Sequence, residues 1–312
     1  MAISNYPSGF RGGALIKNAP LYDMIDGNIY WVDSGTGGAG GTGAFTNPTA
    51  TIQQGIDLCT ANNNDVVFVR ANHAETISDA TELTPNVAGV SIIGLGRGTG
   101  RPTITFDNAS SSIAVSAADV TMQNFVWHST AADVADAVTP TAKRLVLKDI
   151  VLTNSGAGQN WVDLVDLSTT DNQADGLTLQ RIRWKDIDTS TYSMVNVDAN
   201  IDRLSILDCY VDLGINGVVS TFIMCDAGSS TTNLLIQGNY KSRLEADNSL
   251  QVGTFADTAT AKTGLLKWND CRSLDTAGEL FLTATSNVHS DENYTTSVID
   301  KSGYASVPAV DS

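Results

Sequence analysis

The chain repeats a short apolar motif seven times, at intervals of 25 to 32 residues. In almost every copy the first residue and the residue two positions later are apolar, and this spacing indicates a β-strand rather than a helix. A unit of this length cannot bury its own apolar face, so it must stack on copies of itself. The first residues of the motifs, here called the anchors, are Val90, Val120, Leu145, Leu177, Leu204, Leu234 and Leu265.

Most of the repeats contain a further apolar segment that can form a second strand, for example residues 162–167 and 194–197. Two or three short strands per turn of about 28 residues are typical of a parallel β-helix. Leucine-rich repeats are usually shorter and carry an Asn or Cys signature, while propeller blades need roughly 40 residues or more. We therefore predict an all-β fold, a parallel β-helix solenoid whose anchors point inward and lie above one another on one sheet.

A polar residue stands four positions after several anchors, and the residue that follows it is apolar. Polar side chains at a fixed place in stacked coils mark a bend, where they can bond to the backbone of their own or the next coil. We expect these residues to form a structural ladder. They are Asn124, Asp149, Arg181 and Asp208.

The segment 49–60 is the one convincing helix, because Ile52, Ile56 and Cys59 form an apolar stripe at helical spacing. A proline and several threonines supply its start signal. An amphipathic helix placed just before the repeats is expected to cover the open end of the core and its unpaired strand edge. The Gly-rich run 34–43 lacks the lysine of a phosphate-binding loop, so we interpret it as a flexible hinge.

Composition excludes several classes of partner. The formal charge of -16 and the pI near 4.3 argue against binding to a nucleic-acid backbone. No run approaches the roughly 20 apolar residues of a membrane span, and the first residues show no secretory signal. The cysteines fit neither a zinc motif nor a disulfide framework, and those within the repeat are expected to be buried. They are Cys59, Cys209, Cys225 and Cys271.

Two stretches resemble known families. Residues 43–57, in which a glycine, Asn-Pro and Thr-Ile-Gln lead into the helix, resemble the start of right-handed β-helix proteins of the pectin-lyase-like superfamily. Residues 6 to about 106 are similar to virion structural proteins of tailed bacteriophages, through segments 7–10, 29–32, 72–77 and 87–96. The resemblance implies a right-handed coil and a trimeric component of a phage particle, without indicating where on the particle it lies.

Enzymes of this superfamily cleave acidic polysaccharides, so the resemblance requires a search for catalytic groups. The Asn-Thr-Asp, Asp-Asp, Gly-His-Gly and Arg-Ile-Lys blocks of its hydrolases are absent, and only residues 181–183 come near the last. One acidic cluster could form a carboxylate or metal site, although aspartates at the bends of an acidic solenoid are ordinary. It consists of Asp186, Asp188, Asp202, Asp208 and Asp212, with Arg181, Arg183 and Arg203 nearby.

The histidines and tryptophans favour structural roles. His73, His128 and His289 fall at unrelated phases of the coil, and His73 is expected to fix the first turn by hydrogen bonding. Four tryptophans follow apolar strands and are expected in the core or at a trimer interface rather than in a row that binds sugar. They are Trp127, Trp161, Trp184 and Trp268. No cofactor and no metal are expected.

We divide the chain into an extended N-terminal arm with its hinge (1–45), the parallel β-helix with its cap helix (46–281) and a C-terminal cap or tail (282–312). The arm is expected to attach the protein to its partner and to be dispensable for folding of the β-helix. It carries aromatic and aliphatic residues outside the repeat that need somewhere to bury. The residues expected to bind the capsid are Phe10, Leu21, Tyr22, Tyr30 and Trp31.

The resemblance and the missing catalytic blocks together favour a non-enzymatic virion structural protein, a trimeric capsid decoration or cement protein that binds and stabilises the shell. Its partners would be the major capsid protein and further copies of itself, with no nucleic acid and no membrane. It would be made in the host cytoplasm and end on the capsid surface of the virion. The alternative is a tail spike or receptor-binding adhesin that binds or depolymerises host surface glycan, and a free polysaccharide lyase or hydrolase ranks third.

Overall fold

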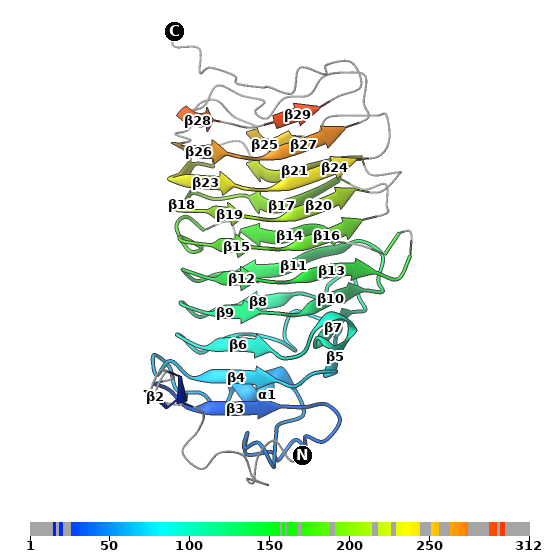
Figure 1. The fold of residues 1–312 in the computed structure, drawn as a ribbon, viewed down its shortest axis with the longest axis vertical. Coiled ribbons are helices and arrows are strands. Elements are labelled where there is room, and N and C mark those ends of the chain that lie inside the picture. Colours follow the sequence, from blue (N-terminus) through cyan, green and yellow to red (C-terminus); the bar gives the residue numbers. More distant parts are fainter. Residues whose placement is uncertain are drawn as a thin grey trace.

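The computed structural model of the chain contains three long β-sheets that wind together into an elongated coil (Figure 1). It describes residues 15–16, 19–20, 26–156, 158–159, 161–167, 170–186, 191–213, 218–225, 229–243, 251–255, 263–273, 287–291 and 294–296. Phe10, Leu21, Tyr22 and Asp188 lie outside the described residues, so the expectations for them stay predictions.

The repeated motifs build one sheet of ten strands, which we call the anchor sheet. Its strands are β3 (Ile29–Val32), β4 (Val66–Val69), β6 (Ser91–Gly94), β9 (Thr121–Gln123), β12 (Val146–Lys148), β15 (Thr178–Gln180), β19 (Ser205–Leu207), β23 (Leu234–Gln237), β26 (Thr263–Lys267) and β28 (Asn287–Asp291).

The second sheet has nine strands and the third sheet has six. The second sheet comprises β5 (Ala74–Ile77), β7 (Thr103–Phe106), β10 (Val126–Ser129), β13 (Val151–Asn154), β16 (Arg183–Asp186), β20 (Tyr210–Leu213), β24 (Tyr240–Arg243), β27 (Asp270–Ser273) and β29 (Tyr294–Thr296). The third sheet comprises β8 (Ile113–Val115), β11 (Val134–Pro140), β14 (Trp161–Leu167), β17 (Thr191–Val197), β21 (Val218–Cys225) and β25 (Gln251–Phe255).

From β6 to β25 each coil visits the anchor sheet, the second sheet and the third sheet in turn, and its strands pair in parallel with those of the next coil. This order defines a parallel β-helix and confirms the predicted fold class, and the right-handed sense is the one that parallel β-crossovers take. Smaller elements are the pairs β1 (Leu15–Ile16) with β2 (Ala19–Pro20) and β18 (Ile201–Asp202) with β22 (Thr231–Thr232), and the short helices α1 (Ile52–Ile56) and η2 (Gly98–Gly100).

The anchors stack as predicted, with one correction. The residues that follow Leu145, Leu177 and Leu204 pair with one another across β12, β15 and β19, so these anchors lie on adjacent coils. The six anchors from Val90 to Leu234 are buried. In the last repeat Leu234 pairs with Gly264, so Gly264 and not Leu265 takes the anchor position. A one-residue shift moves a strand's side chains to its other face, and accordingly Leu266 is buried while Leu265 is half-buried.

Sharp bends close both ends of the anchor strands. The residue four positions after the anchor has a positive φ in Asn124, Asp149, Arg181 and Asp208, with values of 52–67°, so the predicted bend is confirmed. At the other end of the strand, the residue just before the anchor also has a positive φ, which is near 60° in Asp119 and Arg144. Only a few residue types tolerate this left-handed backbone.

Arginine–aspartate pairs link the bends of neighbouring coils. Arg181 donates two hydrogen bonds to Asp149, of 2.6 and 2.8 Å, and Arg144 donates two to Asp119, of 2.5 and 2.6 Å. In both pairs the arginine hydrogen bond is the main cause that lowers the pKa of the aspartate. The bidentate Arg181–Asp149 pair and the 2.7 Å hydrogen bond from Asn124 Nδ2 to the Gly94 carbonyl belong to the predicted ladder. The Arg144–Asp119 pair, at the other end of the anchor strands, was not predicted.

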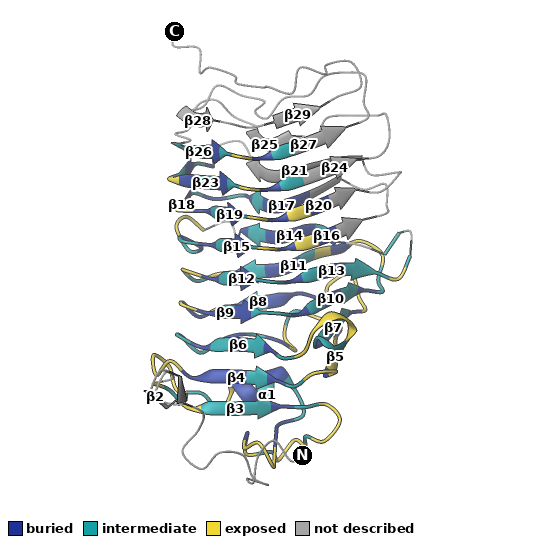
Figure 2. Ribbon diagram, in the orientation of Figure 1, coloured by how far each residue is buried: buried dark blue, intermediate teal, exposed yellow. Residues whose placement is uncertain are grey.

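Aromatic side chains and asparagines fill the interior as well as aliphatic ones. Trp127, Trp161 and Trp184 are buried in the core, as the sequence predicted, whereas Trp268 is about half exposed, at 51%. Figure 2 shows buried positions recurring on the strands of successive coils. Towards the C-terminal end the interior holds an amide ladder, in which Asn239 Nδ2 donates to Asn269 Oδ1 and both side chains donate to backbone carbonyls, all at 2.9 Å.

The solenoid begins earlier in the chain than its sequence division suggests. Strand β3, which we placed in the arm, pairs in parallel with β4 and forms the first rung of the anchor sheet. Helix α1 is shorter than the predicted segment 49–60 and packs its buried residues, Ile52 and Ile56, against β3 and β4. The loop after β3 covers the free strand edge, because Trp31 bonds to the backbone of Gly43 and Thr49.

The coil also continues beyond residue 281. Strand β28 pairs with β26 in the anchor sheet, and β29 pairs with β27 in the second sheet. Both strands lie in the segment 282–312 that we expected to form a cap or tail. The described part of that segment therefore adds a further rung to the solenoid.

Candidate functional site

A buried histidine and glutamate join the first coil to the Gly-rich loop. The Nδ1 atom of His73 accepts a hydrogen bond from Ser34 N–H at 2.9 Å, so its Nε2 atom carries the proton and donates to Glu75 Oε2 at 3.0 Å. The same oxygen of Glu75 accepts a hydrogen bond from Ile52 N–H at 2.9 Å, at the first turn of α1. His73 therefore fixes the first turn by hydrogen bonding, as predicted.

Asp33 and Arg70 bind the same loop from the outside. Nη1 of Arg70 donates to Asp33 Oδ2 at 2.9 Å and to Thr36 Oγ1 at 3.2 Å, while Nη2 donates to the carbonyl of Phe45. The hydrogen bond from the Thr36 hydroxyl is the main cause that lowers the pKa of Asp33 to about 2, against the opposing effect of burial. The Gly-rich run is thus tied to the body of the protein at several points, which corrects its interpretation as a flexible hinge.

Phe45 projects from this loop in a fixed orientation. It stands on a hydrogen-bonded turn, residues 44–47, and its ring meets Trp31 edge to face with 5.0 Å between the ring centroids. The guanidinium of Arg70 lies 4.5 Å from the centroid of the Phe45 ring. Phe45 nevertheless remains 60% exposed. An exposed large apolar side chain held in this way is a candidate contact for a partner.

Trp31 extends this surface along the outer face of the anchor sheet. Trp31, Phe68 and Ile93 occupy the same register position on β3, β4 and β6, and the Trp31 and Phe68 rings lie 5.2 Å apart. All three are half-buried, while the residues beside them on each strand point into the core. The row ends at β9, where Gln123 takes the position. We call Phe45, Trp31, Phe68 and Ile93 the N-terminal apolar patch.

Of the five residues predicted to bind the capsid, the structure describes Tyr30 and Trp31. Trp31 belongs to the patch. Tyr30 shares the register of the buried Val67 and so lies on the opposite side of the strand, where burial is the main cause that raises its pKa. Phe45 was not selected from the sequence, although an aromatic residue just after a Gly-rich run was a visible signal.

The predicted acidic cluster is not one group in the described part of the chain. Asp202 and Asp208 lie at opposite ends of β19. Asp202 accepts a 2.7 Å hydrogen bond from Asn233 Nδ2, which is the main cause that lowers its pKa. Asp212 pairs in register with Lys185, and Asp186 with Leu213, so Asp186 and Asp212 lie on adjacent strands.

A different set of carboxylates meets on the third sheet, on β11, β14 and the residue after β17. Asp136 and Asp163 are in register on adjacent coils. The half-buried Asp136 has its pKa raised to about 7, chiefly by burial and then by Asp166, Asp163 and Asp198. Asp163 accepts a 3.1 Å hydrogen bond from Ser193 N–H and another from the Ser193 hydroxyl. A carboxyl group protonated near neutral pH beside ionised ones can donate a proton, but the same pattern also occurs in structural networks.

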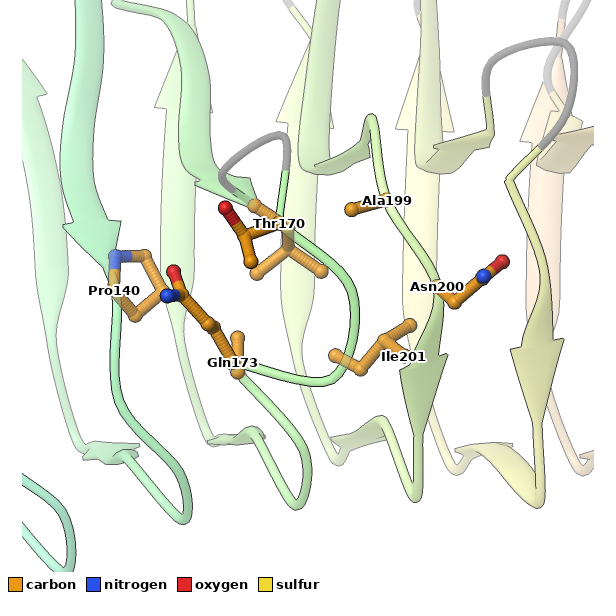
Figure 3. A pocket seen from close by; sticks show the side chains of 8 residues that line it. Pro140, Thr170, Gln173, Ala199, Asn200 and Ile201 are labelled. Carbon is orange, nitrogen blue, oxygen red and sulfur yellow. The ribbon is translucent and has the colours of Figure 1, made fainter.

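A small depression opens where the coil passes from the third sheet to the anchor sheet (Figure 3). Its floor is apolar and its rim carries three uncharged polar side chains. The Asn200 amide already accepts hydrogen bonds of 2.8 and 2.6 Å from Ser230. The labelled lining residues are Pro140, Thr170, Gln173, Ala199, Asn200 and Ile201.

The described residues hold neither a metal-binding group nor a helix that could span a membrane. No three histidine, cysteine, aspartate or glutamate side chains in that part of the chain come together as a metal-binding group. Among the helices that the structure describes, none has the length and apolar character needed to cross a membrane. The described thiols are unreactive in character, since burial raises the pKa of both Cys59 and Cys209 to about 12.

The fold places the chain among right-handed parallel β-helix proteins. No family model and no curated protein matches the sequence. Similar solved structures include a rhamnogalacturonan lyase, with 11% identity over 86% of this chain and 88% of that one and a TM-score of 0.46. Another is the pectin methylesterase from Aspergillus niger, with 13% identity over 91% and 92% of the two chains and a TM-score of 0.44. Similarities this weak carry no argument about activity.

Proposed function

We propose that this chain is a non-enzymatic structural protein of a tailed-phage particle, a trimeric decoration or cement protein that binds the capsid shell by its N-terminal end. The observation that supports this proposal most directly is how the first coil is built. Helix α1, the His73–Glu75 pair and the Asp33–Arg70 pair close that end and hold it rigid. The same coil displays the N-terminal apolar patch, which suits attachment to a larger surface. The sequence resemblance over residues 6 to about 106 supplies the phage context.

The alternative is a tail spike or adhesin that binds host glycan. The raised pKa of Asp136 is the specific observation that favours it, because carboxyl groups of this kind serve as acids in glycoside cleavage. The bonds from Ser193 to the neighbouring Asp163 favour a structural role instead. A direct assay separates the two readings.

We predict that the protein does not turn over host glycan. Purified protein incubated with capsular or lipopolysaccharide glycan of the host should release neither reducing ends nor unsaturated uronates above the level of heat-denatured protein. Turnover that persists in Asp107→Asn but disappears in Asp136→Asn or Asp208→Asn would contradict the proposal and favour the tail-spike alternative. Asp107 serves as the control, because it is exposed and belongs neither to the predicted acidic cluster nor to the carboxylates of the third sheet.

We also predict a homotrimer. Sedimentation equilibrium at micromolar concentration should give three times the 32.9 kDa of one chain. A monomer both in solution and on the shell would contradict the trimeric part of the proposal. A monomer in solution that is seen as a trimer on particles would show that the shell surface drives assembly.

A further inference from the structure

We infer that the N-terminal apolar patch is a docking site for a protein partner that offers an apolar pocket to the Phe45 ring. The inference rests on the proposed function and deepens it. It transfers the main attachment contact from the first part of the arm (1–45), residues 1–25, to the folded first coil of the solenoid.

The first reason is the preorganisation of Phe45. Its backbone lies in a closed turn, its carbonyl accepts a hydrogen bond from Arg70, and its ring contacts both Trp31 and the Arg70 guanidinium, which themselves lie 6.0 Å apart. Arg70 is itself fixed by Asp33 and Thr36. A side chain that is already ordered loses little conformational entropy when a partner covers it, so more of its contact energy appears as affinity.

The second reason is the composition of the patch. It contains aromatic rings and has Arg70 beside it, and aromatic residues and arginine dominate the energetic centres of protein interfaces. The positive charge of Arg70 is compensated by Asp33, whose Oδ2 atom lies 2.9 Å from Arg70 Nη1. The patch is therefore poor in net charge on a chain of formal charge -16, and interface centres are similarly depleted in charged residues.

Two other occupants fit less well. A second copy docking patch to patch would form an isologous two-fold pair, which does not build the proposed trimer. A sugar would need free hydrogen-bonding groups beside the ring, whereas the Nη atoms of Arg70 already donate to Asp33, Thr36 and the Phe45 carbonyl. A neutral apolar pocket on a protein surface has neither difficulty.

The test uses the full chain and empty shells from particles that lack this protein. Labelled wild type, Phe45→Ala, Phe45→Leu and Trp268→Ala are titrated onto the shells, and each protein's thermal midpoint is measured. Trp268 is a matched control, since it is 51% exposed and lies at the far end of the anchor sheet. We expect Phe45→Ala to raise Kd at least tenfold with an unchanged midpoint. Phe45→Leu should retain most of the affinity, and Trp268→Ala should change Kd less than about twofold.

The outcomes separate the inference from the proposed function. If the wild type binds shells and Phe45→Ala binds them equally well, the docking inference is wrong. The proposed function then stands, with the arm as the attachment element. A wild type that does not bind shells overturns the proposed function, and the docking inference with it. Self-association that Phe45→Ala abolishes would replace the protein partner by a second copy. Deletion of residues 1–25 should leave binding within about threefold of wild type, because the patch remains.

Discussion

Leu204→Asp is expected to abolish cooperative folding of the solenoid or to lower the free energy of unfolding by more than about 4 kcal/mol. Leu204 is fully buried, and the anchors Leu177 and Leu234 occupy the same position on the coils above and below. A carboxylate at that position would lie among aliphatic side chains, and the surrounding stack offers it no cationic partner. Urea titration followed by far-UV circular dichroism measures the effect.

Two further variants keep this test informative when the aspartate variant is insoluble. Leu204→Ala should fold and lose about 2–5 kcal/mol, the usual cost of a cavity in a packed core. Ser205→Asp changes the next residue, which lies on the outer face of β19, and should shift the unfolding free energy by less than about 1 kcal/mol. Equal effects at positions 204 and 205 would contradict the inward stacking of the anchors.

Asp136→Asn is expected to stabilise the protein at pH 8. The pKa of Asp136 is raised to about 7 in the folded state from an ordinary value of 3.8, so the folded state binds an extra proton between these values. The free energy of unfolding therefore rises as the pH falls from 7 towards 4. The destabilising effect of the Asp136 charge is fully present above pH 7. The amide removes that charge. The variant should be more stable than wild type by roughly 2–4 kcal/mol at pH 8, since each pKa unit corresponds to about 1.4 kcal/mol.

The gain from Asp136→Asn should shrink to less than about 1 kcal/mol near pH 4, where wild-type Asp136 is protonated in the folded state and almost half protonated in the unfolded state. Thermal or urea unfolding at pH 8, 6 and 4 gives the whole profile. Asp107→Asn serves as the control, because Asp107 is exposed and lies outside this group. If Asp136→Asn is no more stable than wild type at pH 8, the carboxylates of the third sheet do not oppose folding as the structure indicates.

The anchor sheet could be predicted from the sequence because its strands are short and flanked by fixed bends. The apolar spacing of two identifies almost every copy, and a polar residue four positions on marks several of them. Among the seven motifs the register error came at Leu265 and Leu266, where two adjacent leucines fit either face equally well. Gly264, which takes the anchor position, leaves no apolar signal of its own.

The third sheet and the patch could not be predicted in the same way. Asp136 and Asp163 are 27 residues apart in the chain, whereas the neighbouring anchors Val120 and Leu145 are 25 apart. Loop lengths vary between sheets, so the register of one sheet does not fix that of another. Phe45 reaches Trp31 and Arg70 only through the folded loop, and its contacts depend on tertiary hydrogen bonds that no local pattern encodes.

The most direct test of the central claim is the copy number and position of this protein on purified phage particles. Quantitative mass spectrometry gives its ratio to the major capsid protein, and cryo-electron microscopy gives its location. The proposal predicts a fixed, high ratio and trimeric density on the capsid surface, joined to the shell by the N-terminal end of the solenoid. A few copies confined to the tail, or absence from the particle, would contradict it.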